Sequence, residues 1–113
     1  MTARNKLLTA PPYPVEQTLK ALGANLRTAR LRRNLTIADM AGKIGTGARA
    51  VADAERGKPS TGIAVYTAML WALDLLHQVA DVAAPDRDEE GQTLALTRER
   101  GRARPKTDLS NDF

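Results

Sequence analysis

The Lys and Arg residues of this 113-residue chain are the ones whose chemistry most clearly indicates a function. Residues 1–60 contain eleven Lys and Arg against four Asp and Glu, whereas residues 61–113 contain six against nine. Such a cationic segment attracts a polyanion, because each phosphate that it neutralises releases condensed counterions. The charge distribution therefore indicates nucleic-acid binding in the first half of the chain. A merely solvated cationic face is the alternative that charge alone leaves open.

Residues suited to catalysis or metal binding are scarce. The chain has no cysteine, and its single histidine, His77, has no second ligand type at metal-binding spacing. The Asp, Glu, Ser and Thr residues form no carboxylate pair or nucleophile–base pair that we can place on one face. We expect no enzymatic activity, no metal and no cofactor, and a surface or interface position for His77.

Apolar periodicity predicts an all-α fold that begins with a long helix over residues 15–33. Its apolar stripe recurs at three- and four-residue spacing and consists of Leu19, Leu22, Leu26 and Ala29. Because the aromatic residues number only four, small and aliphatic side chains must build most of the core.

Two short helices are predicted next. Thr36 stands as an N-cap with Asp39 three residues on, as in a capping box, and Gly45 supplies a left-handed stop, so one helix spans about residues 37–44. The other spans residues 48–55. Two short helices joined by a tight turn containing glycine are the arrangement that places one helix in the major groove of DNA.

Two further helices are predicted after the turn-forming segment 56–60. Ser60 or Thr61 would cap the first of them, whose core positions are Tyr66, Met69, Leu70 and Leu73. The second is short, ends before Pro85 and carries Leu75, Leu76, Val79 and Val82.

Composition predicts three regions along the chain. Residues 1–14 contain three prolines and no periodic pattern, which predicts an extended arm. Residues 15–84 form the helical domain. Residues 85–113 are charged and offer almost no apolar surface, which predicts a largely disordered tail. No apolar run approaches the roughly 20 residues of a membrane span and no signal peptide is evident, so we expect a cytoplasmic protein with no membrane partner.

One part of the chain resembles the XRE-type helix-turn-helix family of phage Cro and repressor proteins. The resemblance is carried by the stretch LTIADMAGKIGTGARAVADAERGKPS and covers about residues 22–76. The family's pattern runs Leu-Thr, a Leu-Ala pair, Ile/Leu-Gly, a recognition helix and Glu-Arg-Gly-Lys. The resemblance implies a compact five-helix, lambda-repressor-like domain. It also implies a transcriptional repressor that binds double-stranded, palindromic operator DNA as a homodimer and is associated with the bacterial nucleoid.

The same resemblance assigns roles to residues. It places the recognition helix at about residues 48–55 and implies a partly buried ion pair between Arg30 and Glu55 that clamps the first helix to the third. Arg49 is the best candidate for reading a base, because an Arg can donate to O6 and N7 of guanine together. The residues expected at DNA are Thr46, Gly47, Ala48, Arg49, Ala50, Ala52, Asp53, Arg56 and Lys58, with Thr36, Lys43 and Arg27 around them.

The chain departs from the family pattern at two places. Ile37 stands where a glutamine usually bonds phosphate, and Asp53 puts a negative charge near the expected DNA surface. With so many alanines in the recognition helix, recognition can lean on DNA shape or on the arm. Arg4 and Lys6 are candidate minor-groove probes, although an undirected flexible tail is the other interpretation of the arm.

The whole-chain layout also resembles the Hip-type (HipB-like) antitoxins, which are small repressors encoded beside a kinase-like, HipA-type toxin. This resemblance rests on chain size, on the segment LDLLHQVADVAAPDRDEEG and on an arginine-rich tail ending in Phe113. It implies an antitoxin that represses its own toxin–antitoxin operon, with Phe113 as an apolar anchor for the toxin or else as a frayed terminus. We predict dimer or partner contacts at Trp71, Leu75, Leu76 and Val79, with core filling as the alternative for Trp71.

Two other functions stay open at this point. A protein-interaction module that has lost DNA binding is favoured by Ala48, Ala50, Ala52 and Asp53. A free-standing, phage-type regulator without a toxin is the other alternative.

Overall fold

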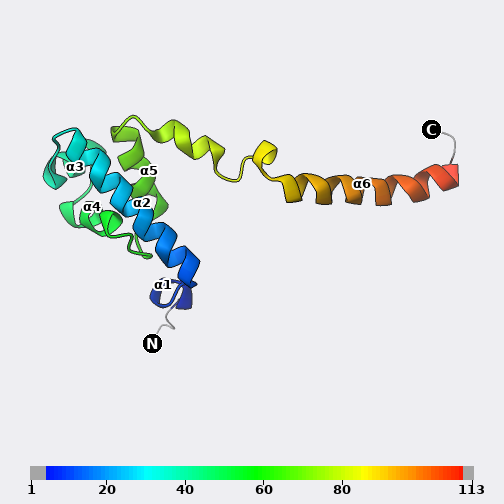
Figure 1. Ribbon diagram of the computed structural model, residues 1–113, viewed down its shortest axis with the longest axis horizontal. Helices are drawn as coiled ribbons and strands as arrows, with labels where there is room; N and C mark the ends of the chain where they lie inside the picture. Colours follow the sequence, from blue (N-terminus) through cyan, green and yellow to red (C-terminus); the bar gives the residue numbers. More distant parts are fainter. Residues whose placement is uncertain (1–4, 111–113) are drawn as a thin grey trace. The chain divides into compact units, whose positions relative to one another are not determined.

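A computed structural model describes residues 5–110, and it describes the side chains of residues 5–102 (Figure 1). All regular structure in this part of the chain is helical, which confirms the all-α prediction. The chain divides into two units between His77 and Gln78, before the expected boundary at residue 84. The first unit contains α1 (Lys6–Thr9), α2 (Tyr13–Arg32), α3 (Ile37–Ile44), α4 (Ala48–Glu55) and α5 (Ile63–Ala72).

The remaining elements are two 3₁₀ helices and one long α-helix. They are η1 (Leu76–Asp81), which crosses the boundary between the units, and η2 (Pro85–Arg87) and α6 (Glu89–Ser110) in the second unit.

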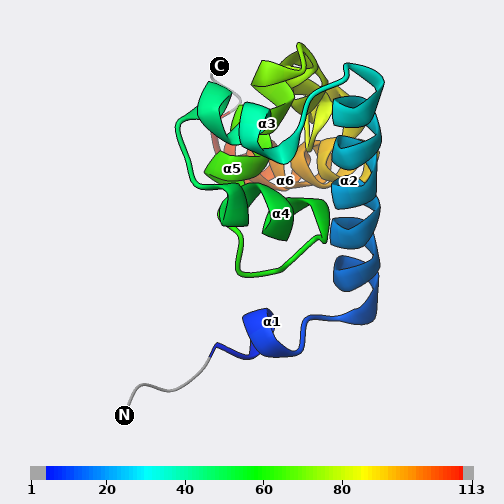
Figure 2. The same cartoon turned by 90° about the vertical axis from the view of Figure 1, so that its left-hand side faces the viewer.

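The core of the first unit lies around α4, which packs against α2, α3 and α5. Figure 2 shows α2 as the long helix on the right, with α3 and α4 to its left. The buried side chains lie on one face of each of these helices, as the apolar periodicity of the sequence predicts. They are Leu26, Met40, Ala41, Val51, Ala54, Tyr66, Met69 and Leu73, with Leu70 and Leu75 partly buried against them.

The ends of α3 follow from local hydrogen bonding. Thr36 and Asp39 form the predicted capping box. At the other end Gly45 adopts φ 76°, a left-handed conformation that glycine takes without steric cost. The amides of Gly45 and Thr46 both donate to the carbonyl of Ala41, at 2.9 and 3.0 Å, and so close the last turn. The bounds of α3, and those of α4 at Ala48–Glu55, are the predicted ones.

The prediction of an extended arm over residues 1–14 is wrong for the part that the structure describes. The side chain of Asn5 accepts a hydrogen bond from the amide of Leu7 and caps α1. Helix α2 then begins at Tyr13 rather than at Val15. Proline is compatible with this start, because the first amides of a helix have no intrahelical acceptor and Pro14 lies in the first turn.

The prediction of a largely disordered tail is also wrong, since α6 spans Glu89–Ser110. Asp88 accepts a hydrogen bond from the amide of Gly91 at 2.9 Å, as an N-cap does. Residues 92–100, QTLALTRER, are mostly good helix formers. Helix propensity acts between neighbours in the chain, so the small amount of apolar surface did not prevent this helix.

Two smaller predictions about helix ends need correction. Neither Ser60 nor Thr61 caps α5; its N-cap is Gly62, which makes no side-chain capping bond. The predicted short helix after α5 is the 3₁₀ helix η1, and none of its residues is buried.

Candidate nucleic-acid interface

The solvent-facing side of α4 is the centre of the candidate interface. Val51, Ala54 and Glu55 hold the opposite side of this helix in the core. Ala48 and Arg49 are exposed, and Ala50, Ala52 and Asp53 are half-buried. The helix therefore presents a guanidinium and small apolar side chains to solvent from a firmly packed base.

The turn between α3 and α4 consists of residues 45–47, with Gly47 as the N-cap of α4. Gly47 makes no side-chain capping bond, so no side chain of the cap competes for the first amides of α4. Amides at a helix N-terminus can bind a phosphate oxygen, aided by the helix dipole. This arrangement suits the role expected of Gly47 and Ala48, whereas the amide of Thr46 is already engaged with the carbonyl of Ala41.

An open hollow of about 530 Å³ lies between α3 and α4. It is lined by Ile37 from the start of α3 and by Ala48, Arg49, Ala52 and Arg56 from α4 and its C-cap. From the sequence, Ile37 was notable only because it replaces a glutamine that usually bonds phosphate. The structure brings it together with four of the expected DNA-contact residues.

Asp53 is not the uncompensated negative charge that the sequence suggested. Its carboxylate pairs with the guanidinium of Arg56 and lies 3.6 Å from Nζ of Lys58, and its side chain is only 13% exposed. Two cations therefore surround one carboxylate, so this cluster remains positive. Because Asp53 holds both partners, we regard it as a residue that positions Arg56 and Lys58.

Hydrogen bonds to the backbone of Lys58 fix the turn that follows α4 and contains Arg56 and Lys58. The amide of Lys58 donates to the carbonyl of Asp53 at 3.0 Å. The hydroxyl of Tyr66, on α5, donates to the carbonyl of Lys58 at 3.3 Å. Burial raises the pKa of the Tyr66 hydroxyl, which therefore stays protonated and able to donate.

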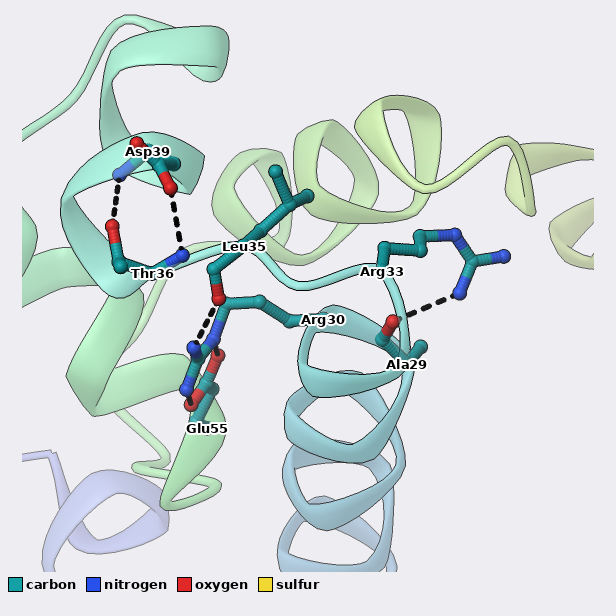
Figure 3. A network of polar contacts seen from close by, with 7 residues as sticks. All are labelled: Ala29, Arg30, Arg33, Leu35, Thr36, Asp39 and Glu55. Carbon is teal, nitrogen blue, oxygen red and sulfur yellow. Dashed lines mark hydrogen bonds and ion pairs between the residues drawn. The ribbon is translucent and has the colours of Figure 1, made fainter.

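The predicted Arg30–Glu55 ion pair is present and is more deeply buried than expected (Figure 3). Nε of Arg30 donates to Oε2 of Glu55 at 2.6 Å and Nη2 donates to Oε1 at 2.9 Å, while the two side chains are 6% and 5% exposed. Nη1 donates to the carbonyl of Leu35 at 2.7 Å, a third connection that sequence reasoning missed. The hydrogen bonds to Glu55 raise the pKa of Arg30.

Figure 3 also shows the capping box that begins α3. The amide of Asp39 donates to Oγ1 of Thr36, and the amide of Thr36 donates to Oδ2 of Asp39, both at 2.9 Å. Hydrogen bonding of the Asp39 carboxyl to Thr36, through the Thr36 amide first and its side chain second, lowers the pKa of that carboxyl. The Thr36 side chain is thus already engaged at the helix start, although the residue is exposed.

The structure does not bring all of the expected DNA-contact residues into the hollow. Lys43 lines a separate hollow of about 320 Å³ with Trp71 and Ala72. Arg27 is exposed on α2 and Lys6 is exposed on α1, and neither lines the hollow beside Arg49. Arg4 and Phe113 lie outside the described residues.

Several large apolar side chains predicted to make dimer or partner contacts are exposed. Trp71 is 61% exposed, Leu76 and Val79 are exposed, and Leu75 is partly buried. Ile63, at the start of α5, is 74% exposed and was not singled out from the sequence. His77 is exposed, as expected of a surface residue.

The part of the chain that the structure describes contains no cluster of three or more His, Cys, Asp or Glu that could hold a metal ion. Among the same residues, no helix combines the length and apolar character needed to cross a lipid bilayer.

No protein-family model, curated protein or solved structure matches this chain.

Proposed function

We propose that this protein is a sequence-specific DNA-binding repressor of the XRE type, which places α4 in the major groove. The observation that carries the proposal is the position of Arg49. It is an exposed guanidinium on a helix whose other side is locked into the core by Val51, Ala54 and the Arg30–Glu55 pair. A rigid base matters, because base readout requires donors held at fixed positions relative to the duplex.

Electrostatics supports the same assignment. Arg49 and Arg56 line the hollow and Lys58 lies in the turn after α4. All three are exposed, and the neighbouring carboxylate of Asp53 is paired. The uncapped start of α4 adds its amides for a phosphate. We assign Arg49 to a base edge, and Arg56, Lys58 and the first amides of α4 to phosphates.

We propose further that the protein acts as a homodimer through α5. The sequence of α5, IAVYTAMLWA, has no charged residue and is apolar around the whole helix. Helices of this kind are normally buried on all sides, yet Ile63 and Trp71 are exposed. A second copy could cover this face; a palindromic operator would then require its α4 to lie about 34 Å from that of the first copy.

The antitoxin role is a proposal on the Hip-type resemblance alone. In that role the protein, in the bacterial cytoplasm and at the nucleoid, would repress the operon that encodes it and a HipA-type toxin. Co-purification with the product of the neighbouring gene, tested with and without residues 103–113, would establish or refute this partner.

Changing Arg49 to Ala tests DNA readout. A preferred duplex is first selected from random sequences with the unaltered protein. The Arg49→Ala variant is expected to lose roughly 5- to 150-fold of its preference for that duplex over a scrambled one per half-site, because each half-site loses one bidentate base contact. Arg87→Ala removes the same charge from the second unit and should preserve the preference.

Two results would contradict the proposal. One is the absence of affinity for any duplex at about 50 mM salt, where phosphate contacts are strongest. The other is full retention of the preference by Arg49→Ala. Either result, with folding intact by circular dichroism, would favour a protein-interaction module.

A further inference from the structure

Three apolar side chains, which we call the floor, and two arginines, which we call the rim, line the hollow between α3 and α4. Ala48 and Ala52 are four residues apart and so lie one above the other on α4, and Ile37 faces the same hollow from α3. Arg49 and Arg56 complete the lining. The three floor side chains offer only methyl and methylene groups, so the floor has no side-chain donor or acceptor.

This floor discriminates among the groups of the major groove. Base edges there present hydrogen-bond donors and acceptors, together with a single apolar group, the C5-methyl of thymine. A donor or acceptor placed against Ile37 and the two alanines would lose water without gaining a partner. A methyl group would instead gain by leaving water.

The cationic rim indicates the setting of that methyl group. Arg49 is suited to a guanine beside the thymine, and Arg56 to a phosphate. The hollow is open to solvent, so the edge of a base can approach the floor.

We propose that Ile37, Ala48 and Ala52 read the C5-methyl group of an operator pyrimidine. The inference rests on the proposed DNA-binding function and deepens it, because it names the chemical group that the alanine-rich helix recognises. Thymine and 5-methylcytosine carry the same group, and the experiment separates them.

The test replaces single thymines of the selected duplex by deoxyuridine, which removes the methyl group and keeps the base pair. At the critical position the affinity of the full chain should fall about fourfold for one half-site and about fifteenfold for both. Exchanging that position for cytosine or 5-methylcytosine gives the second arm. The methylated base should bind more tightly than cytosine by a similar factor, if the floor reads the methyl group itself.

A matched pair of variants assigns the effect to the hollow. Ala52→Ser introduces one hydroxyl into the floor and should bring the thymine-to-uracil affinity ratio close to one. Ala38→Ser makes the same change at an exposed position of α3 that does not line the hollow, and should preserve the ratio.

Affinity that is unchanged by deoxyuridine at every thymine would overturn this inference. If Arg49→Ala still loses discrimination in that case, the proposed DNA-binding function survives without it. If no duplex binds at low salt, both fail together.

Discussion

Arg30 is the residue at which three parts of the first unit meet. Its guanidinium belongs to α2, its two bonds to Glu55 reach α4, and its third bond reaches the carbonyl of Leu35 just before α3. Both charged groups are shielded from water, so each depends on the other. Removal of one partner would leave an unpaired charge in the core.

Arg30→Met should therefore lower the free energy of unfolding by about 3–5 kcal/mol in urea denaturation. The double variant Arg30→Met/Glu55→Leu should be clearly more stable than the single variant, because no buried charge remains. Arg33→Met is the control, since Arg33 is exposed and its guanidinium donates to the carbonyl of Ala29 rather than to a buried carboxylate. A loss below about 1 kcal/mol for Arg30→Met would contradict the clamping role.

Asp39 predicts a pH dependence of stability. The folded state lowers its pKa below the ordinary value of 3.8. The capping bond is therefore fully stabilising above pH 3.8 and is lost as the pH falls through the lower, folded pKa. The stability difference between the unaltered protein and Asp39→Ala should be constant from pH 7 to about 5 and should shrink below about 4.

Urea denaturation at several pH values measures this difference. Asp86→Ala, an exposed acid in η2, serves as the control. A difference that grows on acidification would show that the carboxylate destabilises the helix start instead.

At the scale of the elements, α2 closely approaches the end of α4 at Gly23. A Cβ at Gly23 would lie 2.5 Å from the carbonyl oxygens of Ala54 and Glu55. These are backbone atoms, which cannot rotate away as a side-chain tip can. The glycine thus allows the two helices to approach closely enough for the Arg30–Glu55 pair to form.

Gly23→Ala should destabilise the protein by about 1–3 kcal/mol in thermal and urea unfolding, despite the higher helix propensity of alanine. Gly42→Ala is the matched control within α3, because nothing lies within 4 Å of its added Cβ. That control should be stabilised by up to about 1 kcal/mol. Equal gains for both variants would mean that α2 and α4 are less closely packed than described.

At the scale of the whole molecule, the exposed face of α5 predicts self-association. Ile63→Glu should weaken the dimer more than about tenfold, because a carboxylate would be buried between two apolar faces. Sedimentation equilibrium over a range of concentrations measures this change. Val82→Glu is the control, since Val82 is equally exposed, at 74%, but belongs to the second unit.

A chain that sediments as a monomer at every concentration would contradict the α5 interface. So would an Ile63→Glu variant that dimerises as tightly as the unaltered protein.

Local interactions made much of the fold predictable from the sequence. The capping box of Thr36 and Asp39 and the left-handed Gly45 act within a few residues, so they locate the start and end of α3 without knowledge of the other helices. The stripe that contains Tyr66 and Met69 likewise predicts the buried side of α5. Asp88, the N-cap of α6, is a local feature of the same kind. It was not used in the prediction of a disordered tail, which rested on the small amount of apolar surface.

Only the tertiary structure decided the character of the candidate interface. Ile37 became part of the hollow because α3 packs beside α4, and Asp53 became a paired, positioning residue because the turn folds Arg56 and Lys58 around it. Spacing alone did not predict Arg30 and Glu55 as partners; the family resemblance did, and the third bond to Leu35 came from the structure. Caps and helical periods depend on neighbours in the chain, whereas burial, pairing and exposed apolar faces depend on which helices meet in space.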